Sequence, residues 1–185
     1  MTTLHNLWAT PIWELDIDAP IAQLLQDIPI DNNNLDYVDY QVWDLPFDSV
    51  SDFKQIFQQI IQDTIAETYQ DYNVTLSIKK SWINKQSPGE KIPAHNHNGI
   101  NLIAILYLQG TTNSGDLILL DSRGGVDWGW DTYNGYTGTK CVSFTPVVGK
   151  LLLMPAYIVH YVEENKTDIN RISLVTELKL NLKLK

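Results

Sequence analysis

The stretch Leu102–Leu120, LIAILYLQGTTNSGDLILL, is the part of the sequence that best indicates the fold. It holds an apolar run over Leu102–Leu108, a segment rich in Gly, Thr, Asn and Ser over 109–115, and a second apolar run over Leu117–Leu120. Short apolar runs bounded by turn residues are typical of buried strands. The stretch therefore predicts two short strands joined by a turn.

Most of the sequence around this stretch has the same strand-like pattern. A helix is expected first, at 51–70, because apolar residues recur there at three- and four-residue spacing. Further strands are expected at 74–85, 149–154, 157–162 and 172–182. A helix followed by about eight short strands is typical of a β-sandwich or barrel with helices packed outside.

The first fifty residues carry weaker signals. A short strand is expected within Ala9–Leu15, and one or two helical turns within Pro20–Ile28, where a proline stands at the start. Ser49 or Ser51 is the expected N-cap of the helix at 51–70, since serine hydroxyls accept hydrogen bonds from unpaired backbone N–H groups.

Length and composition limit the class of protein. The 185 residues suit one domain, with an N-terminal strand and supporting helices in residues 1–73 and the barrel core in residues 74–185. A net charge of −9 argues against a nucleic-acid partner, since phosphate contacts need clustered Lys and Arg. The single cysteine, Cys141, fits a reducing compartment. Without a signal-peptide pattern or an apolar run of ~20 residues, we expect a cytoplasmic protein with no membrane span.

Three of the four histidines form a candidate metal site. His95 and His97 stand two residues apart, so on an extended strand both side chains lie on the same face. His160 is distant in the sequence, on another expected strand, and an antiparallel barrel can bring the three together. Two neighbouring ligands and a distant third are typical of a facial metal site that leaves positions open for other ligands.

Arg171 and Ser173 form a candidate anion-binding pair. Arg171 follows His160 by eleven residues, and Ser173 lies two further on, on the same face of the expected strand. A guanidinium in a dry site binds a carboxylate with two parallel hydrogen bonds, and a nearby hydroxyl can complete the bonding. The alternative is that Arg171 lies on the surface and pairs with Asp168 or Glu177, but its spacing from His160 favours the anion site.

The segment 121–140 departs from the strand pattern. It combines several glycines with four aromatic residues, Trp128, Trp130, Tyr133 and Tyr136. A loop of about twenty residues inside a compact domain is unusual and often functional, so a lid or a substrate-binding loop is expected. A pair of short strands with poor propensity is the alternative.

Several motifs resemble those of the 2-oxoglutarate- and Fe(II)-dependent oxygenases. Their order is similar to that in the prolyl-hydroxylase-like and nucleic-acid demethylase branches: Trp82-Ile-Asn84, Ser87-Pro-Gly89, His95-Asn-His97, Leu106-Tyr-Leu108 and Gly115-Asp116. The chain more closely resembles a group of uncharacterised bacterial and phage oxygenases that begin near ATPIW and have H-x-H in place of H-x-D. The ending of that group is matched by Pro146, Gly149, Leu151, Pro155, His160, Arg171 and Ser173.

The resemblance implies a double-stranded β-helix, which is a jelly-roll barrel of the cupin type. It also implies an enzyme that hydroxylates its substrate with Fe(II) and the co-substrate 2-oxoglutarate. In this reading His95 and His160 bind iron, and Arg171, assisted by Ser173, binds the distal carboxylate of 2-oxoglutarate. Asn84 becomes a candidate contact to the co-substrate. Two positions after it the chain has Gln86, where many relatives have an aromatic residue.

His97 is where the chain departs from the wider superfamily, which has Asp or Glu at this position. Imidazole is also a good iron ligand, but a site of three neutral histidines is one charge more positive. We prefer His97 as the third ligand. The alternatives are water or Asp116 in its place, or loss of the metal, although Asp116 is more simply read as part of a turn.

Partners and rival functions follow from the same features. We expect a small-molecule or peptide substrate, and a homodimer could form through an exposed edge strand such as 172–182. One rival function is a cupin-like module that binds a metal such as Zn²⁺, or a small ligand, without turnover. The other is a structural protein that retains the barrel as a scaffold.

Overall fold

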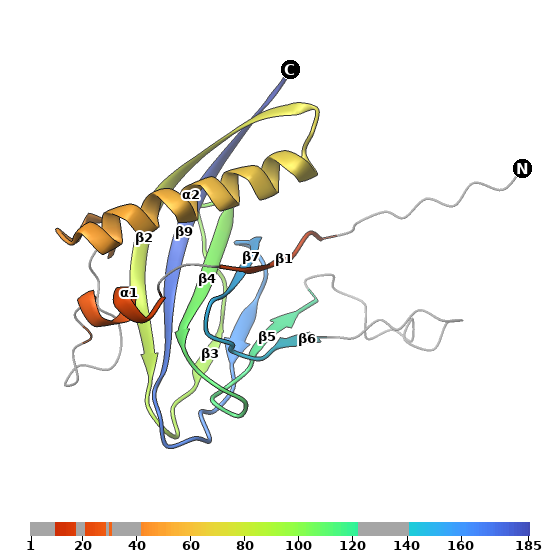
Figure 1. The fold of residues 1–185 in the computed structure, drawn as a ribbon. Helices are drawn as coiled ribbons and strands as arrows, with labels where there is room; N and C mark the ends of the chain where they lie inside the picture. The colour runs from red at the N-terminus through yellow and green to blue at the C-terminus, as the bar shows by residue number, and fades with distance from the viewer. Residues whose placement is uncertain (1–9, 18–20, 29, 31–41, 122–140) are drawn as a thin grey trace, which may run out of the picture.

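The computed structural model describes residues 10–17, 21–28, 30, 42–121 and 141–185. This part of the chain forms nine strands, two α-helices and a short 3-10 helix (Figure 1). The strands are β1 (Trp13–Asp16), β2 (Tyr72–Gln86), β3 (Ile92–His95), β4 (Leu102–Gln109), β5 (Leu117–Leu120), β6 (Cys141–Phe144), β7 (Lys150–Pro155), β8 (His160–Val162) and β9 (Arg171–Leu184). The helical elements are α1 (Ile21–Asp27), η1 (Val42–Asp44) and α2 (Asp48–Thr68).

The strands form two antiparallel sheets. The larger has the order β1-β7-β4-β9-β2 and the smaller the order β3-β8-β5-β6. Strands from both sheets contribute buried side chains to one apolar cluster, which includes Ile103, Leu117, Met154 and Val162. The predicted mainly-β architecture with flanking helices is therefore confirmed, and the sequence signal at 102–120 corresponds to β4, a turn and β5.

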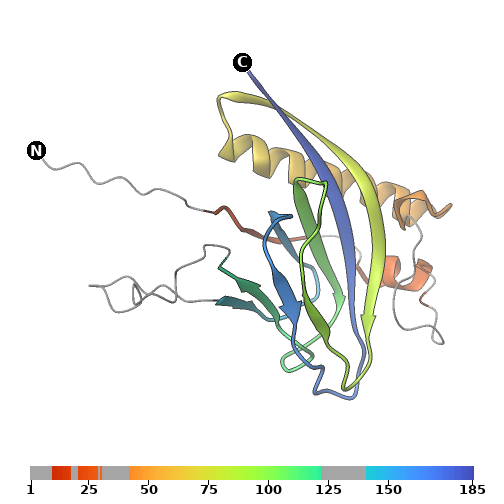
Figure 2. The ribbon, with the colours of Figure 1, turned by 180° about the vertical axis from the view of Figure 1, so that it is seen from behind.

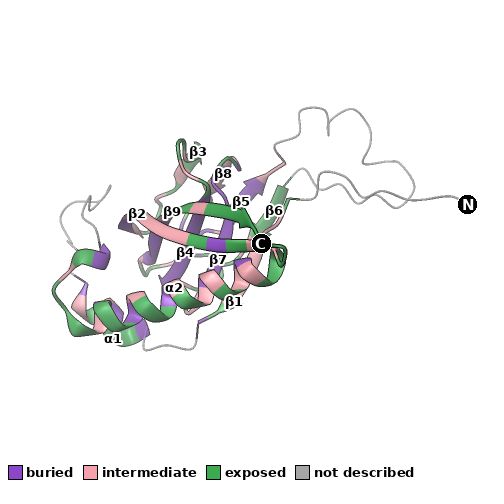
Figure 3. Ribbon diagram, turned by 90° about the horizontal axis from the view of Figure 1, so that it is seen from above, coloured by how far each residue is buried: buried purple, intermediate pink, exposed green. Residues whose placement is uncertain are grey.

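Helix α2 covers the outer face of the larger sheet (Figures 1 and 2). Its apolar side chains Phe53, Phe57, Ile61 and Ile65 are at most 2% exposed, while its opposite side faces solvent (Figure 3). Burying one such side chain contributes roughly 1.5–3 kcal/mol relative to leaving it in water. The predicted amphipathic helix is confirmed because its apolar stripe has a sheet to pack against.

The start of α2 differs from the prediction. The N-cap residue is Phe47, which makes no side-chain cap hydrogen bond, so the N-cap expected at Ser49 or Ser51 is wrong. Ser49 lies in the first turn, where its hydroxyl donates to the Asp27 carboxylate at the end of α1. That hydroxyl therefore joins two helices instead of capping one.

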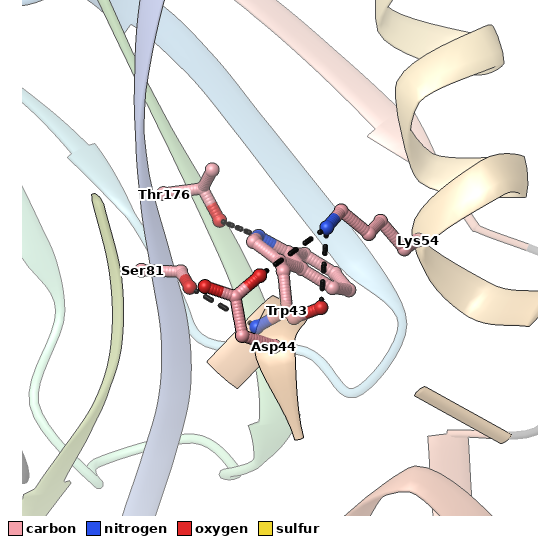
Figure 4. Close-up of polar contacts among 5 residues, drawn as sticks. All are labelled: Trp43, Asp44, Lys54, Ser81 and Thr176. Carbon is pink, nitrogen blue, oxygen red and sulfur yellow. Dashed lines mark hydrogen bonds and ion pairs between the residues drawn. The ribbon is translucent and has the colours of Figure 1, made fainter. Parts of the chain in front are cut away.

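Trp43 on η1 ties the helical layer to the sheet (Figure 4). Its indole Nε1 donates to Thr176 Oγ1 on β9 at 3.0 Å, and its backbone N–H donates to Ser81 Oγ on β2 at 3.3 Å. On α2, Lys54 donates to the Trp43 carbonyl and pairs with Asp44 at 3.6 Å. These contacts fix the helical layer against the middle of β2 and β9, at Ser81 and Thr176.

The pairing of β2 with β9 sorts their side chains onto two faces. Ser81 and Thr176 are register partners and both contact Trp43 on the helix side. Successive residues of a strand point to opposite faces, so their neighbours in the sequence point to the other side. The register pairs there are Trp82 with Val175, Asn84 with Ser173, and Gln86 with Arg171.

Gly115 makes a close backbone contact between the β4–β5 turn and the end of β8. Its φ is +98°, and a Cβ at this position would lie 2.4 Å from the Glu163 carbonyl oxygen. Gly115→Ala is therefore expected to lower the free energy of unfolding by about 2–4 kcal/mol, through both backbone strain and a clash. Chemical denaturation would measure the change.

Gly89→Ala is the matched control for that experiment. Gly89 also has a positive φ, +84°, but a Cβ there would meet nothing within 4 Å. Strain alone costs roughly 1–2 kcal/mol. An equal loss of stability in the two variants would contradict the proposed clash at Gly115.

Three expectations about exposed or irregular segments have different outcomes. Strand β9 lies between β4 and β2, so the expectation of an edge strand at 172–182 is wrong for the part that pairs on both sides. The β4 partner ends opposite Leu178, and beyond it β9 pairs with β2 alone.

The predicted lid or loop at 121–140 lies, from residue 122 on, outside the described residues. No helix in the described part is long and apolar enough to cross a membrane.

Candidate active site

The smaller sheet brings the three predicted histidines together. His95 ends β3 and His160 begins β8, and the two are register partners across these antiparallel strands. His97 lies just beyond β3, not on it as expected, and its backbone N–H donates to the Ala156 carbonyl at 3.0 Å. One potential ligand atom from each histidine lies within 4.8 Å of the others, so the group could hold a metal ion.

Each imidazole has its Nδ1 atom engaged by an oxygen. His95 Nδ1 lies 2.9 Å from the Pro93 carbonyl and His160 Nδ1 lies 3.0 Å from the Ile158 carbonyl. His97 Nδ1 lies 3.2 Å from Glu177 Oε1. Because carbonyl and carboxylate oxygens only accept, the proton of a neutral imidazole in each of these contacts lies on Nδ1, which leaves the Nε2 lone pair free. This is the tautomer that binds a metal through Nε2.

Burial keeps two of these imidazoles neutral. Desolvation, followed by the nearby His95, lowers the pKa of His97 to about 4, and desolvation likewise lowers the pKa of His160 to about 4. The ring centroids of His95 and His160 are only 4.4 Å apart, a separation at which two charged rings would repel. The Nε2 lone pairs of His97 and His160 are therefore available to a metal at neutral pH without loss of a proton.

Arg171 is buried inside the barrel, not on its surface. The side chain is 1% exposed, and its terminal NH1 donates to Gln86 Oε1 at 2.7 Å. The guanidinium carbon also lies 5.0 Å from the centre of the Tyr107 ring. Burial lowers the pKa of Arg171, but a guanidinium remains charged at neutral pH. The alternative pairing with Asp168 or Glu177 is therefore not what the structure has, since Glu177 contacts His97 instead.

Several buried polar atoms around Arg171 have no hydrogen-bond partner within the described part of the chain. They are Arg171 Nε, Ser173 Oγ, Tyr107 OH and Gln86 Nε2. Trp82 Nε1 also has no partner there, but its ring lies near His97 instead. Burial raises the pKa of Tyr107, so its phenol keeps a proton to donate. Leaving a buried donor unpaired costs about 1–3 kcal/mol, and native proteins have few such groups. A cluster of them beside a buried cation is therefore suited to an anion with several acceptor oxygens.

The three histidines line the same pocket as Arg171 and Ser173. Its polar lining consists of Asn84, His95, His97, His160, Arg171 and Ser173, and Trp82 also reaches it. Its apolar wall consists of Ile92, Ile105, Leu117, Val162 and Val175. The pocket thus offers one group that suits a metal and another that suits a carboxylate, with apolar walls that limit access of water.

The positions of Asn84 and Asp116 test two further sequence-based expectations. Asn84 lines the pocket and is the register partner of Ser173, so it is placed where a bound molecule could contact it. The Asp116 carboxylate instead accepts hydrogen bonds from Ser143 at 2.6 Å and Thr145 at 3.2 Å. It joins the β4–β5 turn to the region of β6 and does not belong to the histidine group.

Sequence reasoning missed the roles of Gln86, Tyr107 and Glu177. In the sequence Gln86 stands out only because an aromatic residue is usual at its position, and Glu177 only as a possible partner of Arg171. The alternation of β2 was the available signal, since Trp82, Asn84 and Gln86 fall on one face of an extended strand. The partner of each residue on β9 could not be read without the register.

The sequence of residues 80–177 matches the family described as "Putative 2OG-Fe(II) oxygenase". The match spans just over half of the 185 residues and includes the three histidines, Arg171 and Ser173. The chain belongs to this family. The oxygenase is therefore assigned Fe(II) and 2-oxoglutarate as cofactor and co-substrate, which confirms the class of enzyme predicted from the sequence.

Solved structures of oxygenases have the same fold. An oxidoreductase of the 2OG-Fe(II) oxygenase family from Burkholderia pseudomallei is 15% identical, with a TM-score of 0.60 over 86% of this chain and 75% of that one. A prolyl-4-hydroxylase from Pseudomonas putida is 13% identical, with a TM-score of 0.59 over 92% and 88%. HygX from Streptomyces hygroscopicus, with nickel and 2-oxoglutarate bound, is 11% identical, with a TM-score of 0.58 over 92% and 83%.

These identities are low, so the likeness establishes the fold alone. It confirms the predicted double-stranded β-helix of the jelly-roll, cupin-like type. A search of curated proteins by sequence found no match. The roles of individual residues in the oxygenase rest on the geometry of its own pocket.

Proposed function

We propose that this oxygenase binds Fe(II) through His95, His97 and His160 and hydroxylates a small-molecule or peptide substrate, with 2-oxoglutarate as co-substrate. One observation carries the proposal: a single pocket holds three imidazoles with their Nδ1 atoms engaged and a buried guanidinium beside unpaired donors. The co-substrate is a molecule with a metal-chelating 2-oxo acid at one end and a carboxylate at the other. The pocket has a group suited to each end.

The donor set fits Fe(II). Imidazole is a good ligand for iron, and three imidazoles leave positions open for a chelating co-substrate and for oxygen. When bound, Fe(II) would supply the redox chemistry by which O2 oxidatively decarboxylates 2-oxoglutarate to succinate and CO2, with one oxygen atom entering succinate and the other the C–H bond of the substrate. The protein's own residues bind, orient and shield the reacting molecules.

The anion-binding group sets the position of the co-substrate. Arg171 contributes its charge and its Nε–H, and Ser173 contributes a hydroxyl group that has no hydrogen-bond partner within the described part of the chain. Tyr107, whose ring lies beside the guanidinium, is proposed to contribute its hydroxyl group as well. Gln86 holds the guanidinium in place by accepting a hydrogen bond from NH1, which leaves the Nε–H group to donate to the co-substrate. Asn84, opposite Ser173, is proposed to contact the same molecule. Hydrogen bonds to a charged group contribute about 1.5–3 kcal/mol each.

The proposal is tested by adding Fe(II) and 2-oxoglutarate to the purified protein. Under anaerobic conditions we expect a visible charge-transfer absorption from the iron–2-oxoglutarate chelate, and in air we expect slow formation of succinate without added substrate. His95→Ala serves as the control and should abolish both signals. Absence of both signals from the wild-type protein would contradict the enzyme proposal.

The same experiment separates the oxygenase from a binding module that works without turnover. Three histidines also suit Zn²⁺ with an open position. Zn²⁺ in the protein as isolated, with neither absorption nor succinate after exchange for Fe(II), would favour that alternative. The cytoplasmic location, the organisation as one domain with its core at 74–185, the homodimer, and a lid at 121–140 stay predictions.

A further inference from the structure

A carboxylate lies directly behind one of the three proposed ligands. Glu177 Oε1 is 3.2 Å from His97 Nδ1, and the two side chains are only 20% and 10% exposed. A neutral imidazole whose Nδ1–H donates to a carboxylate keeps its Nε2 lone pair, and its ring is held in one orientation. The contact therefore has the form of a metal-ligand histidine supported by an acid.

His97 differs in this respect from the other two histidines. The Nδ1 atoms of His95 and His160 donate to backbone carbonyls, which orient the rings without adding a formal charge. Three neutral imidazoles leave a divalent ion with its full charge, in a pocket that also contains the Arg171 guanidinium. Buried charge is costly unless an opposite charge lies near. Glu177 is in direct contact with the histidine group and can supply that charge, although the positive charge of Lys80 on the facing strand also acts on it.

The fold explains why Glu177 reaches this place. It lies on the same strand and the same face as Arg171, Ser173 and Val175, because the four alternate along β9. The strand thus carries the proposed co-substrate anchor near its start and Glu177 six residues further on. The opposite residue on β2 is Lys80, and next to it Trp82 places its ring 5.8 Å from the ring of His97.

We propose that Glu177 is a positioning residue that acts on the metal through His97. It holds the imidazole with Nε2 free for the metal, and it supplies the negative charge that the three-histidine set lacks. The inference rests on the proposed function, because it requires a metal at His95, His97 and His160. It goes further by giving a role to an acid that binds neither metal nor co-substrate.

The first test compares two variants that each remove one negative charge. Glu177→Gln keeps the size of the side chain and an oxygen that can accept from His97, whereas Glu164→Gln changes an exposed residue away from the pocket. The readout is the dissociation constant of Fe(II), or of Co²⁺ as its stand-in, measured anaerobically by competition with a coloured chelator. Loss of a carboxylate behind a metal-bound histidine typically weakens binding 10–100-fold. We expect about tenfold for Glu177→Gln and no change for Glu164→Gln.

The second test repeats Glu177→Gln in a His97→Asp background. Asp at 97 places a carboxylate among the ligands themselves, so the acid behind it is no longer needed and only repels it. We expect Glu177→Gln to leave metal affinity unchanged or to improve it in this background. A residue with a purely structural role would instead cause the same loss in both backgrounds.

The outcomes distinguish this inference from the proposed function. If Glu177→Gln binds metal as the wild type does while His95→Ala does not bind it, the inference is wrong and the metal site stands. An equal loss from Glu177→Gln in both backgrounds would also overturn it. If His95→Ala retains wild-type affinity, the metal site itself is wrong, and the proposed function fails with it.

Discussion

His160→Ala is expected to weaken binding of Fe(II) by at least about 100-fold. The proposed site has three protein ligands, and loss of one removes a share of a metal-binding free energy that reaches about 10 kcal/mol or more in well-formed sites. His160 is also the most buried of the three, 3% exposed, so little else can take its place. Equilibrium competition with a coloured chelator under anaerobic conditions would measure the affinity.

A second variant guards against a loss that comes from unfolding. Replacing a buried His160 leaves a cavity, which by itself lowers stability. His95 is only partly buried, and His95→Ala should give a comparable loss of metal with a smaller change in thermal stability. Wild-type affinity in a folded His95→Ala protein would exclude the three-histidine site.

Arg171→Ala is expected to weaken binding of 2-oxoglutarate by about 100-fold while metal affinity changes little. A buried guanidinium that donates two hydrogen bonds to a carboxylate contributes roughly 3 kcal/mol, and each 1.4 kcal/mol is a factor of ten. Pyruvate is the matched ligand, because it has the 2-oxo acid but lacks the distal carboxylate. The variant should therefore lose the preference for 2-oxoglutarate over pyruvate, measured by titration in the presence of metal.

Gln86→Glu makes the same test without opening a cavity. Gln86 Oε1 already accepts from Arg171 NH1 at 2.7 Å, so a glutamate of the same size would pair with the guanidinium and compete with the co-substrate. We expect a marked loss of 2-oxoglutarate binding with an unchanged affinity for metal. Parallel losses of metal and 2-oxoglutarate in both variants would point to a collapsed fold and not to an anion anchor.

Much of the architecture could be predicted from local patterns. The apolar stripe of α2 and the apolar runs of β4 and β5 appear in the structure within a few residues of their expected bounds. The stripe of α2 is a strong signal because its buried positions recur with the helical period, and the two runs are strong because these strands are buried on both faces. Short strands were harder: β6 was not expected, and β8 covers only the end of the range proposed for it. Strands β6 and β8 are equally short but, unlike β5, have no continuous apolar run, so they are defined by their partners across the sheet.

For the candidate site too, the sequence predicts which residues take part, whereas the contacts between them depend on the tertiary structure. The sequence by itself determined which histidines and which arginine to consider, because H-x-H, a distant His and an Arg eleven residues later form a spaced motif. Tertiary structure alone decided what lies against them. Gln86 meets Arg171 only through the β2–β9 register, and Glu177 meets His97 only because β9 passes behind the loop after β3. Contacts between residues about eighty positions apart depend on strand pairing, and no local spacing encodes which residues will pair.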